Sequence, residues 1–153
     1  MWCRLEFRKT TPIDLSSVTH PNIMSARLVW TSVNVLMALL FAFAVVVQVN
    51  DPDPVAWMAL YGAATVVCVL EVRRKAPWWA SCGVGVIALI WAVTIAPRVL
   101  GVVPFASMFE EFEMKNVGVE ESREMYGLLL VALWMLAVEW AGMRRRRASA
   151  QRA

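Results

Sequence analysis

Four long apolar runs, separated by short polar segments, dominate the pattern of this chain. Leu28–Asn50, Pro54–Leu70 and Ala76–Pro97 contain no charged residue, and neither does Met125–Val138, whose apolar character continues to Ala141. A transmembrane helix needs about 20 mainly apolar residues to cross about 30 Å of hydrocarbon. The pattern therefore predicts an all-α membrane protein, a bundle of four transmembrane helices. The expected spans cover about residues 28–49, 54–72, 78–97 and 121–142.

Small and aromatic residues within these runs suggest how the spans pack and where the membrane surfaces lie. Small residues at i and i+4 let helix backbones approach closely in lipid. Such pairs are Ala38 with Ala42, Ala59 with Ala63, and Ser81 with Gly85. Tryptophan and tyrosine gather at membrane interfaces. The rings expected in such a belt are Trp30, Trp78, Trp79 and Trp140 on one side, and Trp57 and Tyr126 on the other.

Composition and charge add an orientation. Apolar residues make up 59% of the chain, against about 45–50% in a soluble domain. Four spans bring the chain ends and the middle loop to one side, which then holds twelve of the 15 basic residues: Arg4, Arg8, Lys9, Arg27, Arg73, Arg74, Lys75, Arg144, Arg145, Arg146, Arg147 and Arg152. The other side holds Arg98, Lys115 and Arg123. Basic flanks stay in the cytoplasm, so both termini are expected there (N-in/C-in), in a plasma membrane or a bacterial inner membrane.

Three segments lie outside the four spans. Residues 1–24 are polar, contain the only histidine and have no periodicity, so we expect a disordered or non-native tail before a membrane domain over 25–143. Residues 144–153 form a basic tail, which suits a membrane flank on anionic lipid better than a nucleic-acid site. Pro104–Met114 carries Phe105, Met108, Phe109 and Phe112 on one helical face. This spacing predicts a short amphipathic interfacial helix between spans three and four.

The turn between spans one and two is the first of two acidic motifs. Asp51 and Asp53 each precede a proline, which favours extended backbone. Asp53 is then expected to cap span two, with Pro54 as its first helical residue, and Asn50 to end span one in a left-handed conformation. These roles at the helix ends do not explain why Gln48 and Asp51 are present. A polar amide such as Gln48 at membrane depth usually seeks a partner.

The second motif leads into span four. Glu120, Arg123, Glu124 and Gly127 share one helical face, with Glu121 beside them. Acids complement the dipole at a helix N-terminus, whereas a cation opposes it. Arg123 therefore makes sense if a carboxylate lies opposite it.

Both motifs are expected on one side of the membrane, where they form one candidate cluster. Its residues are Gln48, Asn50, Asp51, Asp53, Trp57, Tyr61, Glu120, Glu121, Arg123 and Glu124. Two interpretations stay open. Arg123 could clamp the helices by pairing with Asp51 or Asp53, or the cluster could bind a cation or a small polar ligand through carboxylate and amide oxygens. No EF-hand spacing is present, and the metal, if any, is unknown.

The same two motifs resemble those of the transmembrane protein 220 family. The residues that carry the resemblance are Gln48, Asn50, Asp51, Pro52, Asp53, Pro54, Trp57, Tyr61, Glu120, Glu121, Arg123, Glu124 and Gly127. The resemblance extends over about residues 30–140. It implies a small multi-pass membrane protein and brings no reaction with it.

Chemistry-bearing motifs are otherwise absent from the sequence. There is no glycine-rich phosphate loop, no HExxH pair and no Ser/His/Asp set, so no catalytic residue and no cofactor is expected. Glu71 and Glu139 are interpreted as interfacial carboxylates beside nearby counterions, namely Arg74 and Lys75, and Arg144. We expect a structural or accessory membrane component, or alternatively a small transporter or a cation-binding or polar-ligand-binding protein. Its partners would be the lipid bilayer and either a second copy or other membrane proteins, with no nucleic acid.

Overall fold

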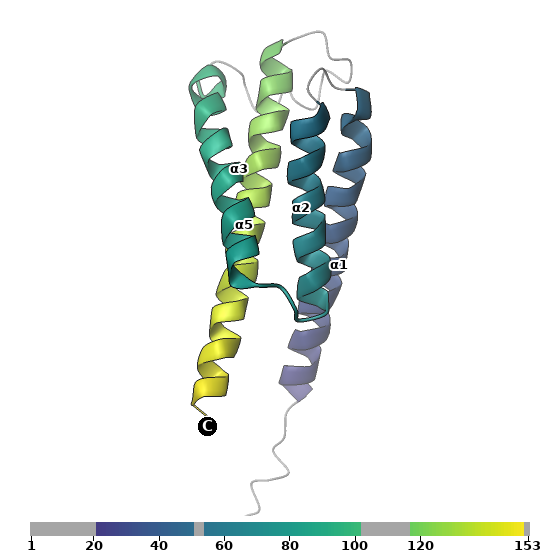
Figure 1. Cartoon of the computed structure of the whole chain (residues 1–153), viewed down its shortest axis with the longest axis vertical. Helices are drawn as coiled ribbons and strands as arrows, with labels where there is room; N and C mark the ends of the chain where they lie inside the picture. The colour runs from purple at the N-terminus through teal and green to yellow at the C-terminus, as the bar shows by residue number, and fades with distance from the viewer. Residues whose placement is uncertain (1–20, 51–53, 102–116, 152–153) are drawn as a thin grey trace, which may run out of the picture.

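The chain folds into four long α-helices that run side by side (Figure 1). The computed structural model describes residues 21–50, 54–101 and 117–151. The helices are α1 (Pro21–Val47), α2 (Pro54–Val72), α3 (Trp78–Val99) and α5 (Val117–Ala150), and the 3-10 turn η2 (Gln48–Asn50) follows α1. All four are long and apolar enough to span a membrane. The predicted all-α fold with four transmembrane helices is therefore confirmed.

Proline and left-handed residues define several helix ends. Pro54 is the first residue of α2, as predicted. This helix ends at Val72 and is followed by a turn in which Arg74 has a left-handed φ of 56°. Two backbone hydrogen bonds close the turn: Arg74 N–H donates to Glu71 C=O and Lys75 N–H donates to Leu70 C=O, both at 2.8 Å. At the end of α1, Asn50 is the last residue of the 3-10 turn η2, and its predicted left-handed conformation stays a prediction.

The bundle consists of two closely packed helix pairs, α1 with α2 and α3 with α5, and contacts between the pairs are sparser. The predicted pair of small residues Ser81 and Gly85 is buried, and a Cβ on Gly85 would come within 3.0 Å of Met135 Cβ. That prediction is correct for α3. For α2 it is wrong, because Ala59 is exposed.

The two ends of the bundle carry different charges. At the end where α2 and α5 finish and α3 begins lie Arg73, Arg74, Lys75 and Arg144–Arg147; we call this the basic end. At the opposite end, where α5 begins, lie Glu120, Glu121 and Glu124; we call this the acidic end. The helix α5 has 34 residues, or about 50 Å at 1.5 Å per residue, which exceeds the hydrocarbon thickness. The predicted interfacial helix over 104–114 and the 51–53 turn lie outside the described residues.

Candidate functional site

A groove at the acidic end separates α1 from α5. It has a volume of about 540 Å³, and no Cα atoms of α1 and α5 approach within 8 Å among the described residues. We call it the amphiphilic groove. Its lining residues are Leu40, Phe41, Phe43, Ala44, Val47, Gln48, Tyr61, Glu120, Arg123, Glu124, Gly127 and Leu130.

The lining follows helical spacing on both walls. On α1, positions 40, 43, 44 and 47 share a face that Gln48 of η2 continues, and on α5 positions 120, 123, 124 and 127 do the same. Both stripes change from apolar to polar toward the acidic end, from Leu40 to Gln48 on one wall and from Leu130 to Glu120 on the other. The groove therefore has an apolar body and a charged end.

The apolar body is open to the surroundings of the bundle. Phe43 is 67% exposed, Val47 50% and Leu130 41%, so a lipid chain can reach the groove from the side. The floor is closed by Phe41 and Tyr61, which are 1% and 7% exposed. Their ring centroids lie 6.3 Å apart, which gives the groove a rigid aromatic base.

Gly127 allows Tyr61 to approach α5 closely. A Cβ at position 127 would clash with the Tyr61 hydroxyl. The absent side chain thus lets α2 present a phenol at the inner wall of the groove, in the same lining as Glu124. The sequence placed Gly127 on the same helical face as Glu120, Arg123 and Glu124. This contact explains why the residue at position 127 is a glycine.

The structure assembles part of the predicted cluster and separates the rest. Gln48, Tyr61, Glu120, Arg123 and Glu124 line the groove. Asp51 and Asp53 lie outside the described residues, as does the Asn50 side chain, so the predicted pairing of Arg123 with an aspartate stays a prediction. Among the described residues, no group of three or more His, Cys, Asp or Glu side chains could hold a metal ion.

Two residues of the predicted cluster, Trp57 and Glu121, do not line the groove. Trp57 was expected in an interfacial belt, but it is 4% exposed and stacks on Trp91 with ring centroids 4.2 Å apart. The belt prediction is wrong for this residue, because it faces the neighbouring helix α3. Glu121 pairs with Arg98 of α3 at 3.0 Å, an interhelical ion pair that the sequence did not indicate.

A second polar site lies at the basic end and centres on Glu71, which is 3% exposed. Its carboxylate binds the Arg145 guanidinium through two contacts, Nη1 to Oε1 at 2.5 Å and Nη2 to Oε2 at 2.8 Å. The Trp30 indole Nε1–H also donates to Oε1 at 2.9 Å. One buried carboxylate therefore ties α1, α2 and α5 together.

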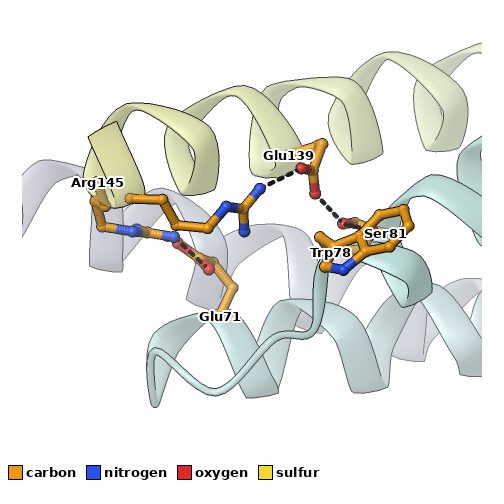
Figure 2. Close-up of polar contacts among 6 residues, drawn as sticks. Glu71, Trp78, Ser81, Glu139 and Arg145 are labelled. Carbon is orange, nitrogen blue, oxygen red and sulfur yellow. Dashed lines mark hydrogen bonds and ion pairs between the residues drawn. The ribbon is translucent and has the colours of Figure 1, made fainter. Parts of the chain in front are cut away.

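Glu139, on α5, also binds an arginine and a second hydrogen-bond donor. Ser81 Oγ donates to Glu139 Oε2 at 3.0 Å, and Arg146 Nη2 donates to Oε1 at 2.5 Å. Figure 2 shows Arg145 directed at Glu71, and Glu139 facing Ser81 at the start of α3. Both carboxylates do have arginine partners, but these are not the predicted neighbours Arg74, Lys75 and Arg144.

Comparison with known proteins identifies the family. Residues 40–140 match the family described as "Transmembrane family 220, helix". The chain belongs to this family. It is also 30% identical over 108 residues to a Xenopus laevis protein named "Transmembrane protein 220", a match that covers 70% of this chain and 56% of the relative. No solved structure matches the chain.

The family match encloses the amphiphilic groove completely. Its range, 40–140, contains every lining residue from Leu40 to Leu130, and also Glu71 and Glu139. The arginines that bind these two carboxylates lie beyond its end, at positions 145 and 146. This transmembrane family 220 member thus carries both carboxylates within the matched region and their basic partners outside it.

Proposed function

We propose that this protein is a non-catalytic membrane component that binds a zwitterionic phospholipid in the amphiphilic groove. The single observation behind the proposal is the polarity gradient along both walls, from Leu40 to Gln48 and from Leu130 to Glu120. An amphiphile has the same gradient from its acyl chain to its headgroup. A groove parallel to the helices thus matches a lipid in both direction and chemistry.

The charges at the polar end favour a headgroup with both signs. Glu120 and Glu124 suit an amine, while Arg123 suits a phosphate, because charge-assisted hydrogen bonds to these groups are the strong ones. The Gln48 amide offers both a donor and an acceptor. Phosphatidylethanolamine, with one phosphate and one primary amine, is therefore the lipid class that we assign to the groove.

The size and openness of the groove support the acyl portion of the proposal. Its volume of about 540 Å³ falls within the about 300–1,000 Å³ that is common for small-molecule sites. Phe43 and Val47 are at least half exposed, so a chain can enter laterally from the bilayer. A lateral entrance requires no rearrangement of the closely packed helix pairs.

A structural role is the second candidate, and the Arg98–Glu121 ion pair favours it. That pair joins α3 to α5 at the acidic end. The predicted contact of Arg123 with Asp51 or Asp53 would add a tie between α5 and the turn that follows α1. In this case the cluster would stabilise the bundle without selecting a lipid, and the experiment below separates the two roles.

The test compares two tryptophan substitutions on adjacent residues of α1. Leu40 lines the groove and is 44% exposed, whereas Leu39 is 64% exposed and does not line it. Wild type, Leu40→Trp and Leu39→Trp would be reconstituted in equal mixtures of phosphatidylethanolamine and phosphatidylglycerol. Lipids retained after detergent extraction would be counted by native mass spectrometry.

Retention of phosphatidylethanolamine should be selective in wild type and in Leu39→Trp, and should fall about tenfold in Leu40→Trp. Glu124→Gln should reduce the preference for phosphatidylethanolamine over phosphatidylglycerol, because it removes a partner of the amine. Equal retention in all variants, or no preference in wild type, would refute lipid binding and leave the structural role.

We also propose that the basic end faces the cytoplasm of a plasma membrane or a bacterial inner membrane. The concentration of Arg73, Arg74, Lys75 and Arg144–Arg147 at this end supports that orientation. Single cysteines beside Arg74 and beside Glu120, in a background without native cysteines, would be labelled with a membrane-impermeant maleimide in intact cells. Labelling should occur only beside Glu120; labelling only beside Arg74 would reverse the orientation.

A further inference from the structure

A small polar pocket at the basic end lies between the end of α2, the start of α3 and the last part of α5. Its volume is about 150 Å³, well above the about 10–15 Å³ that one water requires. We call it the arginine pocket. It is lined by Glu71, Arg74, Ala76, Ser81, Val138, Glu139, Gly142, Arg145 and Arg146.

Two of its arginines are paired with carboxylates. Glu71 binds Arg145 through both oxygens, and Glu139 binds Arg146. A Cβ on Gly142 would lie 3.4 Å from Arg146 Nη1 and 3.8 Å from Arg145 Nη2, so both guanidiniums rest over this glycine. Each guanidinium has five N–H donors, and the carboxylates engage only some of them, which leaves donors for a ligand.

Arg74 is the third arginine of the pocket, and its backbone conformation is unusual. Its φ of 56° lies in the left-handed region, where glycine is the common residue at the end of a helix. An arginine there is disfavoured by its own Cβ. Its side chain lines the pocket, and no carboxylate among the described residues lies within ion-pair distance of it.

The pocket is suited to an anion. Three arginines against two glutamates give its lining a net charge of +1, and Arg73, Lys75, Arg144 and Arg147 are adjacent in sequence to the three arginines. Planar guanidiniums recognise phosphate through paired hydrogen bonds. Oriented guanidiniums of this kind, together with the Ser81 hydroxyl, match a tetrahedral phosphate better than a simple halide.

Exposed tryptophans indicate the depth of the pocket in a membrane. Trp78, Trp79 and Trp140 are 59%, 65% and 54% exposed at this end, and the Arg144 guanidinium lies 3.6 Å from the Trp140 ring centroid. Such rings sit at the level of lipid headgroups. The arginine pocket is therefore at the depth where phosphates of the bilayer are found.

We propose that the arginine pocket binds a phosphate monoester, with Arg74, Arg145 and Arg146 as its ligands. An anionic lipid headgroup and a soluble phosphate share this chemistry. The site is separate from the amphiphilic groove, which lies at the other end of the bundle, and its existence does not depend on the function proposed for the groove.

Arg74→Gly and Arg73→Gly form a matched pair of test variants. Each removes one positive charge from the same loop, but only position 74 lines the pocket and adopts the left-handed conformation that glycine prefers. Arg74→Gly should therefore fold at least as stably as wild type, which a thermal unfolding curve would verify. The full chain would be placed in phosphatidylcholine nanodiscs and titrated with dioctanoyl phosphatidic acid or with inorganic phosphate, and binding would be followed by tryptophan fluorescence.

Wild type should bind dioctanoyl phosphatidic acid, Arg74→Gly should weaken binding about tenfold, and Arg73→Gly should change it less than twofold. Comparable affinity for inorganic phosphate would support the site and assign it a soluble ligand, while much weaker affinity would assign it a lipid. Equal weakening by the two variants would show diffuse electrostatic attraction and overturn the proposal. Absence of binding by both probes would overturn it as well.

Discussion

The two ends of the bundle combine glutamate and arginine in opposite ways. At the basic end, Glu71 is 3% exposed and binds the Arg145 guanidinium through both carboxylate oxygens. At the acidic end, Glu120, Arg123 and Glu124 line a wide groove that is open to the surroundings of the bundle. The Glu71–Arg145 pair therefore ties helices together, whereas Glu120, Arg123 and Glu124 line an open groove, and the burial of Glu71 makes the difference.

The largest effect is expected from breaking the buried pair at Glu71. Glu71→Ala leaves Arg145 and the Trp30 indole without their shared acceptor. Because Arg145 is one-third exposed, the loss should be about 2–3 kcal/mol, below the upper range for fully buried pairs. Unfolding in detergent with increasing dodecyl sulfate would measure it.

Glu139→Ala is the matched control, because Glu139 is 18% exposed and its arginine partner 51%. It should cost about 1 kcal/mol or less. Equal losses for the two variants would contradict the distinction between a buried tie and a surface pair.

The next effect concerns the base of the groove. Gly127→Ala should destabilise by about 1–2 kcal/mol, because the new Cβ collides with the Tyr61 hydroxyl. Adding Tyr61→Phe should recover part of the loss, so the double variant should cost less than the sum. Gly62→Ala, where a Cβ meets nothing within 4 Å, should be neutral or stabilising. A similar loss for both alanine variants would disprove the close approach of Tyr61.

A coupling of about 0.5–1 kcal/mol is expected between Arg123 and one aspartate of the 51–53 turn. The reason is that Arg123, which lines the groove, gains electrostatically from a carboxylate across the bundle. The helix dipole adds little, because α5 begins at Val117 and not near residue 121 as predicted, which places Arg123 beyond the first turn. A double-mutant cycle of Arg123→Ala with Asp51→Ala, and another with Asp53→Ala, would measure it by unfolding. Strict additivity in both cycles would remove the clamp and leave Arg123 to the groove alone.

The smallest effect is expected for Arg98→Ala. Arg98 is 61% exposed, and exposed ion pairs contribute about 0–1 kcal/mol. The loss should shrink further at high salt. An effect as large as that of Glu71→Ala would show that the acidic end is tied as firmly as the basic end.

The fold followed from sequence because each span is a local feature. Two charge-free runs of sufficient length, and two shorter runs with their flanking residues, identified all four helices, and Pro54 identified the start of α2. Helical spacing also predicted that Glu120, Arg123, Glu124 and Gly127 share a face, and all four line the groove. Helical periodicity depends only on residues close together in the sequence, so it can be predicted without knowledge of how the helices pack.

Contacts between distant residues could not be predicted in this way. Glu71 and Arg145 are 74 positions apart, and the nearer cations Arg74 and Lys75 were the obvious partners. Arg74 lines the arginine pocket together with Glu71, but the ion pair of Glu71 is with Arg145 of α5. Trp57 was assigned to the interface from its depth alone, whereas its direction around α2 points it at Trp91.

The central claim, that the amphiphilic groove holds a phospholipid, is tested most directly by crosslinking. Phosphatidylethanolamine with a photoreactive diazirine in its acyl chain would be incorporated into liposomes with the full chain, and crosslinked residues would be mapped by mass spectrometry. The proposal predicts enrichment at Phe43, Val47 and Leu130 over Leu36 and Leu133, which are also exposed but lie outside the groove lining. Uniform labelling of all five residues would contradict it.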